Sequence, residues 1–171
     1  MFDGTQHYRF SSLRENIVEH LFVGLALKKL WEHGIVDVEI LRSEFDAYGY
    51  DLVISRGDLV RHVQIKSGTS PKKISVSRFL AERPSGCIVF IVLDDMLNMT
   101  SFMFYGADPG APLPDIEGLK TTKRATANSQ GLKPIRENHR DVPPSAFRKL
   151  NDLDHLLEAL LGLKLKASNE N

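Results

Sequence analysis

The stretch that decides the fold runs from Tyr50 to Ser67 and reads YDLVISRGDLVRHVQIKS. Two apolar-rich segments flank Gly57-Asp58, and a two-residue link led by glycine is typical of a β-hairpin. If these two residues form the turn, Arg56 lies opposite Leu59, and the residue numbers of every opposed pair sum to 115. The sequence therefore predicts both the hairpin and its register.

This register places Asp51 opposite Gln64, and because alternate residues of a strand share a face, Lys66 lies on that face too. The other face collects the apolar side chains Leu52, Ile54, Leu59, Val63 and Ile65. A slip of one residue would move those apolar side chains out of the core. We therefore expect an acid, an amide and a lysine together on the back of a core-facing hairpin.

These three residue types suit a hydrolytic site. A carboxylate and an amide carbonyl are oxygen ligands for a hard divalent cation. The lysine can help to activate a hydroxide, or it can stabilise negative charge that develops on a phosphate. The alternative is that Asp51 and Lys66 form a solvated cross-strand pair and that Gln64 is only a polar surface residue. The order of the helices and strands around the hairpin helps to decide between these two interpretations.

A long helix is predicted before the hairpin, over residues 13–33. Ser12 and Glu15 have the spacing of a capping box at its start, and Gly34 is suited to end it. Five residues follow helical spacing: Ile17, Leu21, Gly24, Leu25 and Lys28.

The remaining elements follow from local pattern. Residues 35–41 are rich in β-branched side chains and predict a strand, and residues 77–83 predict a short helix. The apolar run 87–93 lacks alternation and predicts a strand buried on both faces, followed by an edge strand over residues 101–105. A last helix over residues 151–162 carries leucines at helical spacing, which indicates core packing or, alternatively, a two-fold interface.

Charge is balanced overall but is not evenly distributed. The 171 residues contain 22 Lys and Arg and 22 Asp and Glu, so net charge indicates no particular partner. Between residues 119 and 140, Glu137 is the only acid among six cations: Lys120, Lys123, Arg124, Lys133, Arg136 and Arg140. This segment has no periodicity and is predicted to be a long basic loop. It either contacts phosphates or is a solvated loop.

Composition excludes several classes of protein. With 42% hydrophobic residues and one cysteine, the sequence predicts one ordinary domain over residues 1–171 and excludes disordered, collagen-like and disulfide-rich chains. Cys87 lies in an apolar run, where a buried, unreactive thiol is expected. No segment approaches the roughly 18 to 20 apolar residues of a membrane span, and the start of the chain lacks signal-peptide features. We therefore expect a cytoplasmic protein without a membrane partner.

In its order of elements and in two motifs, the chain resembles the PD-(D/E)xK nuclease superfamily, in the branch where glutamine replaces the second acid. The matching segments are GYDLVI at residues 49–54 and VQIKSG at residues 63–68, preceded by an acid on the first helix. The resemblance covers residues 13–93, within a predicted core of residues 12–105. It implies a restriction-endonuclease-like α/β fold with a central mixed β-sheet flanked by helices.

The resemblance also implies a role for each motif residue. Asp51 would be the central metal ligand, Gln64 the second ligand and Lys66 the catalytic lysine. Tyr50 stands where the family has proline. The change at Gln64 matters more, because a neutral ligand offers less negative charge to a hard cation.

An acid from the first helix would complete such a site. Glu15 and Glu19 lie one turn apart on the same helix face. We favour Glu19 as catalytic residue and metal ligand, because Glu15 is expected to cap the helix; the alternative for Glu19 is an exposed surface glutamate. His62 shares the predicted site face and is a further candidate for substrate contact, with a structural role as its alternative.

Five cations are candidate nucleic-acid contacts: Lys72, Lys73, Lys120, Lys123 and Arg124. The first two lie in the loop that leaves the Gln-x-Lys strand, where a polar solvated loop is the alternative. The six histidines show no paired spacing suited to zinc.

Together these expectations describe a metal-dependent endonuclease, a hydrolase that cuts DNA by in-line attack of an activated water, with Mg²⁺ as cofactor and Mn²⁺ as a substitute. The alternative is a non-catalytic module that binds nucleic acid or protein and retains the nuclease fold, because Gln64 leaves catalytic competence open. A third interpretation is a subunit of a defence or repair assembly, in which a partner protein supplies recognition. A homodimer would present two sites to a duplex.

Overall fold

The predicted hairpin lies at the heart of the fold. In the computed structural model, which describes residues 10–45 and 48–165, β2 (Leu52–Arg56) pairs antiparallel with β3 (Leu59–Gly68). Leu52 lies opposite Val63 and Arg56 opposite Leu59, so the predicted register is confirmed. Gly57 has a φ of 56°, a left-handed conformation that glycine adopts without steric cost.

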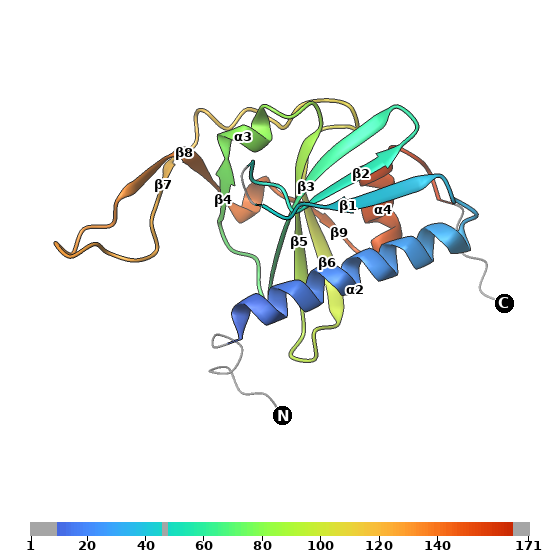
Figure 1. Cartoon of the computed structure of the whole chain (residues 1–171), viewed down its shortest axis with the longest axis horizontal. Coiled ribbons are helices and arrows are strands. Elements are labelled where there is room, and N and C mark those ends of the chain that lie inside the picture. Colours follow the sequence, from blue (N-terminus) through green and yellow to red (C-terminus); the bar gives the residue numbers. More distant parts are fainter. Residues whose placement is uncertain (1–9, 46–47, 166–171) are drawn as a thin grey trace.

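A mixed six-stranded sheet forms around this hairpin, and the class is α/β (Figure 1). Its strand order is β1-β2-β3-β5-β6-β9, with β1 (Val38–Arg42), β5 (Gly86–Leu93), β6 (Met99–Gly106) and β9 (Arg148–Leu150). Only β3 and β5 are parallel neighbours among these described strands. The prediction of an edge strand at residues 101–105 is wrong in its position, because the short strand β9 covers the outer side of β6.

Both faces of the sheet are covered. The helices α2 (Ser11–Glu32) and α4 (Leu153–Leu161) pack on one face, with core residues that include Phe22, Ile54 and Leu157. Ile88 and Phe90 of β5 belong to a second cluster on the other face. Strand β5 is therefore buried on both faces, as its unbroken apolar run predicted.

The last helix is confirmed, and its leucines are part of the core. Leu156, Leu157, Leu160 and Leu161 are all buried against the chain's own sheet. Asp152 caps the helix by accepting a hydrogen bond from the His155 backbone N–H at 2.9 Å. The leucine stripe is thus not available as the two-fold interface that the sequence left open.

The first helix is confirmed in extent, but its predicted capping is wrong. Phe10 is the N-cap and no side chain caps the helix, so the Ser12–Glu15 capping box is not formed. The buried stripe is Val18, Phe22, Ala26 and Leu30. Ile17, Leu21 and Leu25, which share the predicted helical spacing, are exposed; the helix is apolar on two sides, and spacing alone does not show which side packs.

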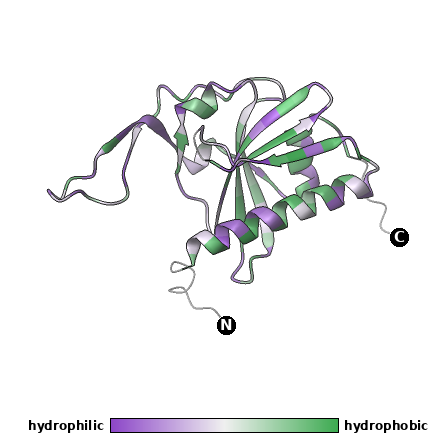
Figure 2. Ribbon diagram, viewed as in Figure 1, coloured by the Kyte–Doolittle hydropathy of each residue, from purple (hydrophilic) through white to green (hydrophobic). Residues whose placement is uncertain are grey.

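A second, three-stranded sheet contains the basic segment. Its order is β4-β8-β7, with β4 (Ile74–Ser77), β8 (Ile135–Val142) and β7 (Thr121–Lys123). The prediction of a structureless loop over residues 119–140 is therefore wrong. We call the β7–β8 hairpin, residues 121–142, the basic arm; it projects away from the six-stranded sheet (Figure 1). Its strand β8 is mostly hydrophilic and exposed (Figure 2).

Shorter helices complete the described chain. The segment predicted as a helix over residues 77–83 forms the end of β4 and the short helix α3 (Arg78–Ala81), which Ser77 caps. A 3-10 helix, η1 (Pro144–Ala146), joins the basic arm to β9. No helix of residues 10–45 and 48–165 combines the length and apolar character that a membrane crossing needs.

The start of β5 passes very close to α3. A Cβ atom on Gly86 would lie 2.4 Å from the backbone oxygen of Leu80, so alanine at this position forces the backbone to move. We expect Gly86→Ala to lower the free energy of unfolding by about 1 to 3 kcal/mol in urea denaturation. Gly118→Ala is the matched control, because a Cβ there meets nothing within 4 Å. Equal stability of the two variants would contradict this packing.

Candidate active site

Lys66 lies where two neighbouring cavities meet, near the end of β3. The smaller, of about 130 Å³, is the acidic cavity; its polar lining consists of Glu15, Glu19, Asp51, Lys66, Ser67 and Lys72. The larger, of about 340 Å³, is the basic cavity; its polar lining consists of Gln64, Lys66, Lys72, Lys73, Ser75, Ser77, Arg136 and His139. Lys66 and Lys72 border both. The structure thus gathers all the motif residues around one lysine.

Asp51 reaches this place by leaving the β2–β3 ladder. The ladder ends at Leu52, and the Asp51 backbone N–H donates to the Val63 carbonyl at 2.9 Å. The Asp51 carboxylate accepts the Ile65 backbone N–H at 2.6 Å and lines the cavity beside α2. The position of Asp51, one residue before the Leu52–Val63 pair, is the one that the predicted register gives opposite Gln64. The two side chains line different cavities, and Lys66 lies between them.

Gln64 is buried, with 5% of its surface exposed, so the alternative of a polar surface residue is wrong. It lies opposite Ile88 in the parallel pair β3–β5. Its Oε1 atom is buried and has no hydrogen-bond partner. A buried amide oxygen without a partner costs free energy, and it is satisfied by a donor or a cation.

Both candidate acids of α2 lie in the acidic cavity. Glu19 accepts a hydrogen bond from the Arg42 guanidinium at 2.7 Å, and Arg42 also contacts the ring of His20 at 2.8 Å. Glu15 is solvent-exposed and does not act as a cap. The reason for favouring Glu19 over Glu15 is thereby removed, and the structure offers both.

Asp141 of β8 binds Lys73, one of the residues that line the basic cavity. Its carboxylate accepts from Lys73 Nζ at 2.5 Å and from the Thr122 hydroxyl at 2.8 Å. Partial burial alone would raise the pKa of Asp141, but the hydrogen bonds from Lys73 and Thr122 and the lysine charge together hold that pKa below its usual value. Asp141 therefore remains an anion that fixes Lys73 at the cavity.

The sequence missed two residues of the basic cavity as site residues. Arg136 Nη2 lies 2.7 Å from His139 Nε2, and both belong to β8. Arg136 was counted only as a charge of the basic segment, and His139 was not singled out. Neither residue could be placed at the cavity from the sequence, because the sequence pattern did not predict strand β8.

Four other predicted residues line neither cavity. The His62 ring lies 4.8 Å from the Tyr50 ring, where burial, and then the charge of Arg83, lower the pKa of the histidine. Lys120, Lys123 and Arg124 lie in or beside β7 of the basic arm. His62 thus packs against an aromatic ring, while Lys123 and Arg124 lie on the basic arm and Lys120 directly precedes it.

Cys87 is buried and unpaired, and burial raises the pKa of its thiol, which agrees with the expected unreactive cysteine. Within residues 10–45 and 48–165, no group of three or more His, Cys, Asp and Glu side chains could hold a metal ion. A cation near Lys66 would therefore need the Gln64 oxygen in addition to the carboxylates.

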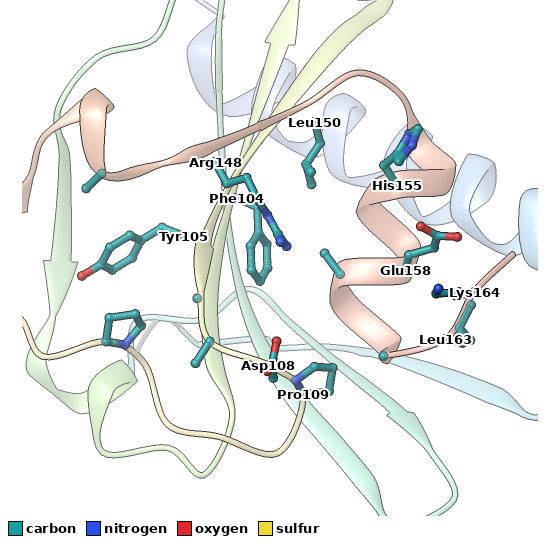
Figure 3. A pocket seen from close by; sticks show the side chains of 16 residues that line it. Phe104, Tyr105, Asp108, Pro109, Arg148, Leu150, His155, Glu158, Leu163 and Lys164 are labelled. Atoms are coloured by element: carbon teal, nitrogen blue, oxygen red, sulfur yellow. The ribbon is translucent and has the colours of Figure 1, made fainter.

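A larger cavity, of about 870 Å³, lies elsewhere, between β6, β9 and α4 (Figure 3). Two of its titratable residues have other contacts: His155 Nδ1 lies 2.6 Å from Asp152, and Glu158 accepts the Leu165 backbone N–H at 2.9 Å. Arg148 lies over the ring of Phe104. None of the motif residues lines this cavity.

Comparison with known proteins does not assign a family. No protein-family model matches the chain, and no curated protein matches it in sequence. The site is therefore interpreted from its own geometry.

The buried Gln64 Oε1 atom, which has no hydrogen-bond partner, leads to a prediction about stability. Replacing it by methionine keeps the side-chain length and removes the buried polar atom. We expect Gln64→Met to raise the free energy of unfolding by about 1 kcal/mol in urea denaturation. Gln130→Met, at an exposed position of the basic arm, should stay within about 0.5 kcal/mol of the native chain. A loss of stability in Gln64→Met would mean that the amide is satisfied in the native protein.

Proposed function

We propose that the chain is a metal-dependent nuclease with a restriction-endonuclease-like core, of the Gln-x-Lys branch of the PD-(D/E)xK superfamily, that hydrolyses phosphodiester bonds of DNA. The observation that carries the proposal is the gathering of Asp51, Gln64 and two helix acids around Lys66. Carboxylates, an amide oxygen and a lysine are the groups that phosphodiester hydrolysis with a divalent cation requires.

The residues around Lys66 fit a hard divalent cation. Gln64 supplies a buried oxygen without a hydrogen-bond partner, and Asp51 supplies a carboxylate from the neighbouring cavity. Asp51 and Gln64 would hold Mg²⁺ or Mn²⁺, and Glu19 would join them after releasing Arg42. When bound, the cation neutralises charge on the phosphate and lowers the pKa of water.

The chain's own cations would carry out the remaining tasks. The Lys66 ammonium borders both cavities and would stabilise the negative charge that develops on phosphate oxygens while it orients the attacking water. Lys72, Lys73 and Arg136 line the basic cavity and would hold the phosphates that flank the scissile bond. The pinning of Lys73 by Asp141 lowers the entropy that this lysine loses on binding.

Cleavage of supercoiled plasmid with Mg²⁺ or Mn²⁺ tests the proposal. We expect Asp51→Asn and Lys66→Met to lower the cleavage rate by about 100-fold or more, because each removes a group that acts on the reacting phosphate. Lys149→Met, an exposed lysine on β9, is the matched control and should cleave normally. Circular dichroism confirms folding of each variant. Undiminished cleavage by either site variant would refute the assignment.

The basic arm is the proposed surface for sequence-independent contact with DNA. Lys123, Arg124 and Lys133 are all exposed on it, and a cation that neutralises a phosphate releases a counterion. We expect the triple alanine variant to bind DNA more weakly and to reduce the slope of log affinity against log salt by about 2 to 3. The measurement is fluorescence anisotropy with a labelled duplex. Lys149→Ala together with Lys164→Ala should leave that slope almost unchanged.

A non-catalytic DNA-binding module is the second candidate function. It is favoured by the ion pair between Glu19 and Arg42 and by the neutral Gln64, which together leave less negative charge to hold a cation. The same two experiments separate the candidates. A binding module binds DNA with the salt dependence of the basic arm and cleaves no plasmid with either metal ion.

A further inference from the structure

An exposed aromatic ring forms part of the wall of the basic cavity. Phe79 lines this cavity and is 39% exposed. It belongs to α3, which contacts β8 at the base of the basic arm (Figure 1). Hydrolysis of a phosphodiester uses charged and oxygen-bearing groups, so the proposed reaction does not account for this ring.

A second exposed ring lies against Phe79. Tyr48 is 48% exposed, and its ring centroid lies 6.5 Å from that of Phe79 in an edge-on arrangement. The Arg83 guanidinium lies 4.2 Å from the Tyr48 ring centroid, and the ring of Tyr50 is stacked 6.4 Å from Tyr48. We call Tyr48 and Phe79 the aromatic rim. The contacts among these side chains make it a continuous surface, in contrast to apolar residues scattered singly over a protein.

Backbone packing keeps the aromatic rim beside the cavity. Gly49 also lines the basic cavity, and a Cβ atom there would lie 2.7 Å from the Cβ atom of Ser77. Ser77 caps α3 by accepting a hydrogen bond from the Phe79 backbone N–H at 3.3 Å. The segment that carries Tyr48 therefore packs directly against the start of the helix that carries Phe79.

The rest of the cavity lining indicates what the aromatic rim contacts. No described Asp or Glu lines the basic cavity, whereas four cations do: Lys66, Lys72, Lys73 and Arg136. These cations favour a ligand with negative charge, and the exposed ring favours a ligand with a flat apolar face. A nucleotide has both, because it joins a phosphate to a base. The cavity volume of about 340 Å³ lies within the range of sites that hold small molecules.

A paired base cannot make this contact. In a duplex each base is stacked between its neighbours, so a side chain reaches the flat face of a base only where the strand is single or the base has left the stack. Aromatic rings beside a positively charged groove are the arrangement with which proteins bind single strands.

We propose that the aromatic rim stacks on an unpaired base of single-stranded DNA while Lys72, Lys73 and Arg136 bind the adjoining phosphates. This inference rests on the proposed function and names its substrate class, which is DNA with unpaired nucleotides at the scissile phosphate. Negatively supercoiled plasmid offers such nucleotides where its duplex opens locally. Phe79 thus selects the substrate through binding.

Fluorescence anisotropy without a divalent cation measures binding separately from cleavage. Three labelled probes are compared: a short single strand, the same strand paired into a duplex, and an abasic strand of equal length, which keeps the phosphates and lacks the bases. We expect the native chain to bind the single strand about 10-fold more tightly than either of the other probes, because stacking adds to the phosphate contacts.

Substitutions of Phe79 test whether the ring itself is responsible. Phe79→Leu keeps an apolar side chain and should weaken single-strand binding by about 5- to 100-fold. It should leave abasic-strand binding and the slope of log affinity against log salt unchanged, because no charge is lost. Phe79→Tyr keeps a ring and should bind like the native chain. Trp31→Ala is the matched control, because Trp31 is 74% exposed and lines neither cavity around Lys66. Circular dichroism checks that each variant folds.

Plasmid cleavage with Mg²⁺ or Mn²⁺ separates this inference from the proposed nuclease activity. Suppose that the native chain cleaves plasmid but binds single strand and duplex equally, or that Phe79→Leu binds the single strand normally or loses the abasic strand to the same extent. Each of these results would overturn the role of the aromatic rim and leave the nuclease standing. A native chain that binds single strands through Phe79 and cleaves nothing would overturn the nuclease and support the aromatic rim.

Discussion

Parallel pairing between β3 and β5 is the interaction on which the rest of the structure depends. It runs from His62 opposite Gly86 to Gly68 opposite Val92. Parallel neighbours cannot be joined by a tight turn, so the chain between them must leave the sheet and return. Here that crossover contains β4 and α3, which cover one face, while α2 covers the other. The two hydrophobic clusters and both cavities around Lys66 follow from this arrangement.

The same pairing explains why the polar residues that β3 contributes to the candidate site lower the stability of the fold. Strand β3 is covered on both faces, so its polar residues are drawn into an apolar interior. Gln64 is buried without a partner for its carbonyl oxygen. Lys66 avoids this cost because it stands at the boundary of two cavities. A sheet selected for stability alone would carry apolar residues at such positions, which is why these side chains indicate function.

Sequence patterns could predict those parts of the fold in which the local sequence is compatible with only one structure. Gly57 fixed the hairpin turn, and the unbroken apolar run of β5 indicated burial on both faces. The packed side of α2 could not be predicted, because the helix has two apolar sides and tertiary contacts select one. Strand β8 could not be predicted either, because Ile135 and Val142 are its only apolar residues, and it exists through pairing with β4 and β7.

The motif residues of the candidate site were predictable from the sequence, whereas Arg136, His139 and the geometry of the site were not. Alternation along β3 placed Gln64 and Lys66 correctly on one strand, and the basic cavity contains both. Asp51 lies just beyond the last pair of the β2–β3 ladder, and its carboxylate accepts the Ile65 backbone N–H and lines the acidic cavity, contacts that the sequence did not predict.

Strand β8 belongs to the basic arm and also to the wall of the basic cavity. It is hydrogen-bonded to β4 on one side and to β7 on the other, and its Asp141 holds Lys73. One part of β8 thus lies in the projecting arm, and its residues Arg136 and His139 line the cavity that Lys66 borders. Because Arg136 and His139 of β8 line the basic cavity, a movement at the base of the arm would also change the charges that face Lys66.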